Sequence, residues 1–235
     1  MNGRVWMPVR ARGPELMDLP DSDPRRLERT LRQIVLVNRL LTGYRKLLER
    51  TVLEDLHHHP GRPPYTLLDV GSGGGDIAAW LARRQPGLRI VCLDRDPRAV
   101  AFARRRCAAL PSIELRVGSV CQLEAMERFD YVLAHDILHH LPEGEIAPAV
   151  QTMLRRARRL LVASDLLRSR QSFLIFSLFA AVFLHRSFAA ADGRLSIRKG
   201  FLPEELQGLL SGIEGFERLT IHCERPGRIV LIGRP

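Results

Sequence analysis

The stretch TLLDVGSGGGD, residues 66–76, constrains the fold of this chain more than any other part of the sequence. An apolar run leads into Asp69, a turn with four glycines follows, and residues 77–82 then have the composition and apolar spacing of a helix. This order predicts a strand, a tight turn and a helix. Glycines allow positive φ angles and a close approach of the backbone to a ligand, and the free N–H groups at the helix start point into the same space. The turn is therefore predicted to hold a nucleotide.

The spacing of the glycines separates two kinds of nucleotide site. A dinucleotide-binding turn has the pattern Gly-x-Gly-x-x-Gly, but the sixth position counted from Gly71 is Asp76. The pattern here is Asp69-x-Gly71-x-Gly73-x-Gly75, which disfavours NAD as the ligand.

Length, charge and cysteine content limit the number of domains and the kinds of site that the chain can form. With 235 residues, 46% of them hydrophobic, it is long enough for one α/β domain with additions and too short for two full domains. The net charge of +10 comes from arginines in nearly every segment, which a codon-usage bias toward Arg explains as well as a nucleic-acid-binding face does. The four cysteines form no Cys-x-x-Cys pair, so we expect neither a zinc site nor disulfides, and a reducing cytoplasm fits.

The N-terminal region is predicted to be a flexible arm followed by helices. Residues 1–20 lack the continuous apolar core of a secretory signal and are interpreted as the arm. Residues 24–42 and 44–56 have helical apolar spacing, and we assign residues 21–60 to a helical lid. The histidines at 57–59 precede several prolines and point in different directions, so they are interpreted as a solvated linker rather than a metal site.

A second acidic residue ends the next predicted strand. Residues 88–94 have the composition of a buried strand and end in Asp94, 25 positions after Asp69. The carboxyl ends of neighbouring parallel strands meet at one edge of a sheet, where a carboxylate can accept two hydrogen bonds from the ribose hydroxyls of an adenosine ligand. Helix capping is the alternative role, although Asp96 is better placed for it. We predict that Asp94, with Arg95 beside it, contacts the ligand.

The motif Asp69-x-Gly71-x-Gly73-x-Gly75 resembles the first motif of the class I S-adenosylmethionine-dependent methyltransferases. The Leu-His-His-Leu stretch at 138–141 is similar to one that follows the fourth strand in many small-molecule members. The resemblance covers most of residues 66–165. It implies an α/β fold, a Rossmann-like doubly wound sheet of seven mostly parallel strands, with residues 65–235 as the methyltransferase domain and a helical insertion at about 168–192.

The resemblance also implies S-adenosylmethionine as the cofactor. Asp69 is expected near its amino-acid end, and the glycine turn beneath its methionine and ribose portions. Family members often carry an acid after the third strand to bind the adenine amino group, whereas this chain has Ser119, so the serine hydroxyl or the backbone of Val120 would substitute. The predicted cofactor contacts are Asp69, Gly71, Ser72, Gly73, Gly75, Asp94, Arg95, Ser119, Val120, Ala134 and His135.

Three residues are predicted to serve catalysis. A phenol or alcohol must lose its proton as it attacks the methyl group, and histidine titrates near the working pH, so we expect His139 or His140 to be the base. Adjacent histidines do not face the same way, so at most one is expected to meet the substrate. Asp165 ends the fifth predicted strand at the same edge, where it would orient a histidine, bind the substrate or cap a helix.

The most apolar run, residues 173–184, is too short to cross a bilayer. A helix apolar on all sides is expected to be buried or to cover an apolar ligand, and we predict that it builds a water-poor pocket with the N-terminal helices. A core or dimer helix is the alternative. Residues 192–201 are predicted to be a loop, a last helix starts at Pro203, and strands follow at 216–222 and 228–232, the second antiparallel at the sheet edge.

Together these features predict a cytoplasmic enzyme that transfers a methyl group to a small, largely apolar acceptor, with O-methylation of a phenolic or polyketide-like natural product as the expected reaction. An RNA methyltransferase and a catalytically silent cofactor-binding protein remain alternatives. We expect no metal, no membrane span and no nucleic-acid partner, and a monomer or homodimer.

Overall fold

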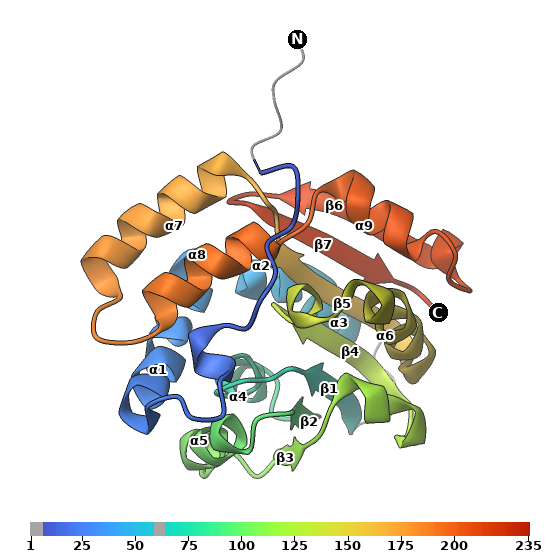
Figure 1. Cartoon of the computed structure of the whole chain (residues 1–235). Helices are drawn as coiled ribbons and strands as arrows, with labels where there is room; N and C mark the ends of the chain where they lie inside the picture. Colours follow the sequence, from blue (N-terminus) through green and yellow to red (C-terminus); the bar gives the residue numbers. More distant parts are fainter. Residues whose placement is uncertain (1–6, 59–63) are drawn as a thin grey trace.

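The computed structural model describes residues 7–58 and 64–235, and these form a seven-stranded sheet flanked by helices (Figure 1). The strand order is β3-β2-β1-β4-β5-β7-β6. The first five strands in this order are parallel, and β7 is antiparallel to both β5 and β6. The strands are β1 (Tyr65–Val70), β2 (Leu88–Asp94), β3 (Ile113–Val117), β4 (Phe129–His135), β5 (Ala157–Leu166), β6 (Leu219–Glu224) and β7 (Arg228–Gly233). This confirms the predicted Rossmann-like architecture.

The α-helices cover both faces of the sheet and the edge at the carboxyl ends of the parallel strands. They are α1 (Pro24–Leu40), α2 (Tyr44–Leu48), α3 (Glu54–His58), α4 (Asp76–Arg84), α5 (Pro97–Cys107), α6 (Glu143–Arg156), α7 (Arg170–Phe183), α8 (Ala189–Lys199) and α9 (Pro203–Leu210). A π-helical turn, Glu49–Leu53, joins α2 to α3. His57 and His58 end α3 with exposed side chains, so they extend the helix predicted at 44–56, whereas His59 lies outside the described residues.

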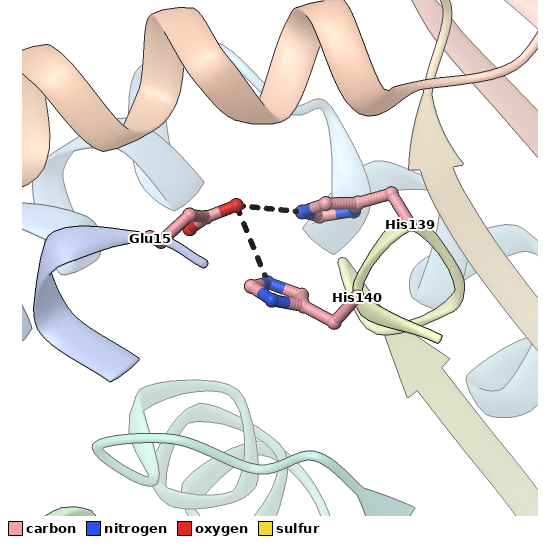
Figure 2. Close-up of side chains that lie close together, drawn as sticks. All are labelled: Glu15, His139 and His140. Carbon is pink, nitrogen blue, oxygen red and sulfur yellow. Dashed lines mark ion pairs between the residues drawn. The ribbon is translucent and has the colours of Figure 1, made fainter. Parts of the chain in front are cut away.

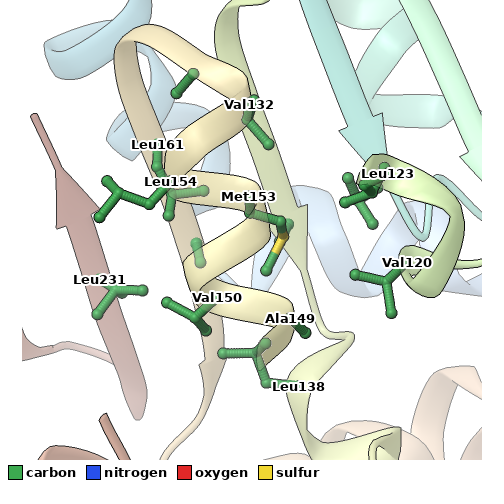
Figure 3. Packing of buried hydrophobic residues seen from close by; sticks show 14 of the residues in the cluster. Val120, Leu123, Val132, Leu138, Ala149, Val150, Met153, Leu154, Leu161 and Leu231 are labelled. Carbon is green, nitrogen blue, oxygen red and sulfur yellow. The ribbon is translucent and has the colours of Figure 1, made fainter. Parts of the chain in front are cut away.

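Side chains that alternate along the strands enter two separate apolar cores. Leu68 and Val132 pack with α6 and α9 on one face. Figure 3 shows Val132 among the apolar side chains of α6. Leu67 and Tyr131 pack with α2 and α4 on the other face. Parallel strands that are buried on both faces have continuous apolar sequences, which explains why their positions could be predicted from the sequence.

Two predicted elements differ from the structure. The segment predicted as a loop at 192–201 is mostly helix α8, because Gly193 lies against α7 rather than breaking the chain: a Cβ there would stand 2.1 Å from the Phe176 ring. At the end of the sheet, β6 occupies the edge and β7 lies between β5 and β6. The antiparallel direction of the last strand is as predicted, but its edge position is wrong, because a hairpin folds it inward against β5.

Helix α7 also differs from its prediction. Its buried residues are Ser172, Phe176 and Ala180, one stripe at helical spacing. Other large apolar side chains of the helix, including Leu178 and Val182, are exposed. The helix is therefore buried on one face only. Within residues 7–58 and 64–235, no helix combines the length and hydropathy that a membrane span needs.

Candidate active site

A cavity of about 370 Å³ lies at the carboxyl ends of β1, β2 and β4. Its floor is the glycine turn after β1, and its roof consists of the N-terminal segment, α1, α7 and α8 (Figure 1). Open α/β sheets place their ligands at this edge. The roof side chains are mainly apolar, among them Ile34, Val37, Leu41, Ile175 and Phe176.

The glycine turn is held in a shape that leaves its backbone open to the cavity. Gly71, Gly73 and Gly75 have φ angles of 71°, 52° and 70°, in the left-handed region that glycine tolerates best. A Cβ on Gly73 would meet nothing within 4 Å, so this residue faces open space, whereas a Cβ on Gly75 would approach Ala103 of α5 at 3.1 Å. Gly71, Ser72 and Gly73 therefore line the cavity, and Gly75 supports the turn from behind.

Asp94 ties this turn to β2. Its Oδ2 accepts a hydrogen bond from the N–H of Gly73 at 2.7 Å, and its Oδ1 accepts one from the N–H of Asp96 at 2.9 Å. A carboxylate has about four acceptor positions, so Asp94 keeps capacity for ribose hydroxyls. Asp96 caps α5 by accepting from the N–H of Arg98, as predicted for that residue. Arg95 also lines the cavity and pairs with Asp18 at 3.1 Å.

Three buried acidic side chains around the turn, Asp69, Asp76 and Asp94, have raised pKa values. Burial, together with the charges of Asp76 and Asp94, raises the pKa of Asp69 to about 8. Burial also raises the pKa values of Asp76 and Asp94, although Asn38 donates to Asp76 at 3.3 Å. The buried hydroxyl of Ser72 has no hydrogen-bond partner among the described residues. A cationic ligand with free hydrogen-bonding groups would satisfy these residues, and S-adenosylmethionine, a sulfonium with an ammonium group, is such a ligand.

The other predicted cofactor contacts fall into two groups. Ser119 and Val120 line the cavity, but the Ser119 hydroxyl accepts from the N–H of Cys121 at 3.3 Å and caps the short helix Val120–Ala125. Ala134 is buried in the apolar core and does not line the cavity.

His135 lines the cavity next to Ala134 and is held in one orientation. Its ring stacks on Tyr44 with centroids 3.9 Å apart, and its Nε2 lies 3.4 Å from Oδ1 of Asn38. Burial lowers the pKa of His135 to about 4, so its ring is neutral. The neutral Nδ1 accepts a hydrogen bond from Arg228 at 3.3 Å. His135 therefore forms an uncharged part of the cavity wall with a fixed ring orientation.

His139 is buried between two carboxylates. Its Nδ1 lies 2.7 Å from Oδ1 of Asp165, and its Nε2 lies 3.5 Å from Oε1 of Glu15. Burial alone lowers the pKa of His139, but the charge of Asp165, the hydrogen bond to it and the nearby carboxylate of Glu15 raise the pKa to about 10. His139 is therefore positively charged near neutral pH and cannot take up a proton there. Asp165 also accepts from the N–H of Leu138 at 2.8 Å, so it positions the histidine loop and does not line the cavity.

His140 points toward the same glutamate and is more accessible. Its Nδ1 lies 3.1 Å from Oδ2 of Asp18, and its Nε2 lies 3.8 Å from Oε1 of Glu15. Figure 2 shows both histidines, on the loop after β4, directed at Glu15 of the N-terminal segment. His140 lines the cavity with about a fifth of its side chain exposed, against 2% for that of His139. Both predicted bases line the cavity, and His140 is the more accessible of the two.

The cluster of Glu15, His139 and His140 also has the composition of a metal site, because one donor atom from each lies within 4.8 Å of the others. However, Oε1 of Glu15 already accepts from Ser196 at 2.8 Å and from the buried ammonium of Lys199 at 3.2 Å. A cation at that oxygen would face the Lys199 charge. The contacts favour an ion-paired cluster, which lowers the pKa of Glu15 well below its ordinary value despite the burial that raises it.

Several residues of the site were missed by sequence reasoning. Glu15 and Asp18 lie in the predicted arm, whose described part packs into the cavity. Asn38 interrupts the apolar pattern of α1, and this interruption was the available signal. Arg228 contacts Ser164, His135 and Asp136 from β7. Asp136 has a φ of 54°, which is uncommon for a residue with a side chain and frequent at functional sites.

Comparison with known proteins agrees with this geometry. Residues 67–161 match a family model described as a methyltransferase domain. Residues 67–161 therefore form a methyltransferase domain. The matched range contains the glycine turn, Asp94 and the histidine pair, whereas the cavity roof lies largely outside it.

Individual relatives of this methyltransferase domain differ in their acceptors. The chain is 39% identical over 80 residues to the ubiquinone biosynthesis O-methyltransferase of Paramagnetospirillum magneticum, covering 33% of this chain and 31% of that protein. It is 48% identical over 56 residues to the ribosomal RNA small subunit methyltransferase H of a Synechococcus species, covering 24% and 18%. The chain thus matches less than a third of the length of either relative.

A structural relative extends the likeness over the whole fold. The plantazolicin methyltransferase BpumL, solved in complex with SAH, superposes with a TM-score of 0.66 and covers 93% of this chain and 92% of its own. The sequence identity is 12%, so this likeness concerns the fold alone.

Proposed function

We propose that this chain is an S-adenosylmethionine-dependent methyltransferase that acts on a small, largely apolar acceptor, and that it methylates a hydroxyl of a phenolic or polyketide-like compound. One observation carries the proposal: a single cavity joins the glycine turn and Asp94 on its floor to apolar side chains of α1 and α7 in its roof. A cofactor held at the floor would have its acceptor in the same enclosed space.

The residues at the floor fit the cofactor. Asp94 would accept from its ribose hydroxyls, Asp69 would face its cationic amino-acid end, and the open side of Gly73 would let it approach the backbone. When bound, the cofactor supplies a methyl group on a sulfonium centre. The contribution of the chain is to orient the acceptor, exclude water and remove a proton.

Proton removal is assigned to His140. Its position in the cavity wall gives it access to an acceptor hydroxyl, and Asp18 at Nδ1 would fix its tautomer and stabilise the charged ring. His139 is assigned a positioning role, since its charge is shared between Asp165 and Glu15. The ion-paired Glu15 then holds the N-terminal segment across the cavity.

The test begins with binding and then measures turnover. Calorimetry with S-adenosylhomocysteine should show one site per chain, and labelled S-adenosylmethionine should transfer its methyl group to members of a panel of phenols and hydroxylated polyketides. Absence of binding would refute the assignment. Binding without turnover on any acceptor would indicate a silent protein, and methylation of RNA in place of the small molecules would indicate the competing acceptor class.

A further inference from the structure

Helix α7 exposes an apolar face that the rest of the chain leaves uncovered. Nine large hydrophobic side chains in residues 7–58 and 64–235 are exposed, and five of them belong to this helix. They are Leu174 (55%), Ile175 (40%), Leu178 (72%), Val182 (58%) and Phe183 (50%). Leu174, Leu178 and Val182 recur every four residues, so they form one stripe, separate from the buried stripe of Phe176 and Ala180.

The apolar face continues into the cavity. Ile175 is both exposed and part of the cavity wall. Val37 and Leu41 of α1 pack against the Phe176 cluster, and both also line the cavity. Leu40 between them along the chain is 56% exposed. An apolar path therefore runs from the exposed face of α7 through Ile175 to the predicted acceptor space.

Arginine side chains flank this apolar face, and the two segments that form it contain no acidic residue. Residues 166–191 and 29–48 contain no Asp or Glu. Arg170 begins α7 and Arg186 follows its end, both with exposed side chains. Arg39 lies beside Leu40 with its side chain exposed. The net charge of +10 has the same sign.

We propose that α7, with the end of α1, docks on the surface of an anionic lipid membrane and that the acceptor is a lipophilic molecule drawn from that membrane. The second part rests on the proposed methyltransferase function. A short helix with an apolar face and flanking cations lies in a membrane interface without spanning it, and each cation adds to its attraction for anionic lipid.

The same charges disfavour a second copy of this chain as the partner. Two α7 helices packed antiparallel about a twofold axis would bring Arg170 of one copy toward Arg186 of the other. Like charges would then meet at both ends of the apolar contact. Anionic headgroups neutralise these arginines instead.

The test is sedimentation of the full chain with vesicles. We expect binding to equimolar phosphatidylcholine–phosphatidylglycerol vesicles, weak binding to pure phosphatidylcholine vesicles, and a loss of affinity as salt rises. The double variant Leu178→Glu, Val182→Glu should lose at least tenfold in vesicle affinity. Val117→Glu changes a 51% exposed valine on β3 and should bind as the wild type does. Arg170→Gln and Arg186→Gln should each lower affinity about fivefold.

Two outcomes would overturn the proposal. One is a wild-type chain that stays in the supernatant with the anionic vesicles. The other is a wild-type dimer in light scattering that the Leu178→Glu, Val182→Glu variant dissociates, which would assign the face to a second copy. Circular dichroism and S-adenosylhomocysteine affinity of each variant report its folding. Vesicle binding is measured without turnover, so it can still be interpreted if the methyltransferase assignment fails.

Discussion

The Nδ1 atom of His139 lies 2.7 Å from Oδ1 of Asp165, and both side chains are almost fully buried. This pair joins the loop after β4 to the end of β5. On its other side, His139 faces Glu15, so one imidazole connects the sheet edge to the N-terminal segment. A buried charge pair of this kind fixes a loop at the edge of the site, because neither partner can be left alone without a large desolvation penalty.

Replacing His139 by Gln should destabilise the protein by about 3–5 kcal/mol, because the carboxylate of Asp165 would remain buried without its cation and Glu15 would keep only Lys199. The folded-state pKa of about 10 is above the unfolded value near 6.5, so the stabilisation is fully present below the unfolded pKa and is lost as pH rises through about 10. Urea denaturation at several pH values measures both effects. A variant with wild-type stability at neutral pH would contradict the charged pair.

Cofactor binding should release a proton from Asp69. With a pKa of about 8, this group is largely neutral at pH 7 in the ligand-free protein, and a cationic ligand favours its ionised form. Affinity for S-adenosylmethionine should therefore increase as pH rises toward about 8, with proton release visible in calorimetry in two buffers. Asp69→Asn should bind more weakly and lose the pH dependence. Equal heats in both buffers would argue against this linkage.

Asp94→Ala should weaken binding of S-adenosylhomocysteine by about 1.5–3 kcal/mol, because it removes a charged acceptor for the ribose and the contact that holds Gly73. Calorimetry measures the change. Glu114→Gln, on the exposed part of neighbouring β3, is the matched control and should leave affinity unchanged. Unchanged affinity in Asp94→Ala would refute the ribose role.

His140→Ala should lower kcat by ~10²–10⁴ while cofactor affinity is retained, as expected for loss of a general base. Asp18→Asn should lower kcat less, since the histidine remains and loses only its orienting partner. His222→Ala on β6, far along the sheet from the histidine loop, is the control. Wild-type turnover in His140→Ala on the true acceptor would place the base elsewhere or mean that the acceptor arrives ionised.

Alanine at Gly71 should be more damaging than alanine at Gly73. Both residues have positive φ, so both substitutions strain the backbone, by about 1–2 kcal/mol. At Gly71 the new Cβ would also lie 2.9 Å from Ile137, whereas at Gly73 it would meet nothing within 4 Å. Thermal unfolding without ligand should separate the two. At Gly73 the added methyl should instead act on cofactor affinity, since it would protrude into the cavity. Equal loss of stability in both variants would contradict the difference in packing.

The sequence by itself determined the sheet and the floor of the site. Residues 66–76 signalled a strand, a glycine turn and a helix through local composition, and Asp94 was found because parallel strands end at a common edge. These signals are local or follow from the regular geometry of a parallel sheet, so no knowledge of distant contacts was needed. The same reasoning located the histidine pair at the cavity.

Only the tertiary structure decided which side chains complete the site. Asp18 meets His140 across 122 positions of sequence, and Glu15 meets Lys199 across 184. The segment that carries these two acids has no apolar periodicity, and its path is set by burial against α8 and the histidine loop. The apolar composition of α7 likewise left open which face would be covered, because burial depends on what packs beside a helix rather than on the helix itself.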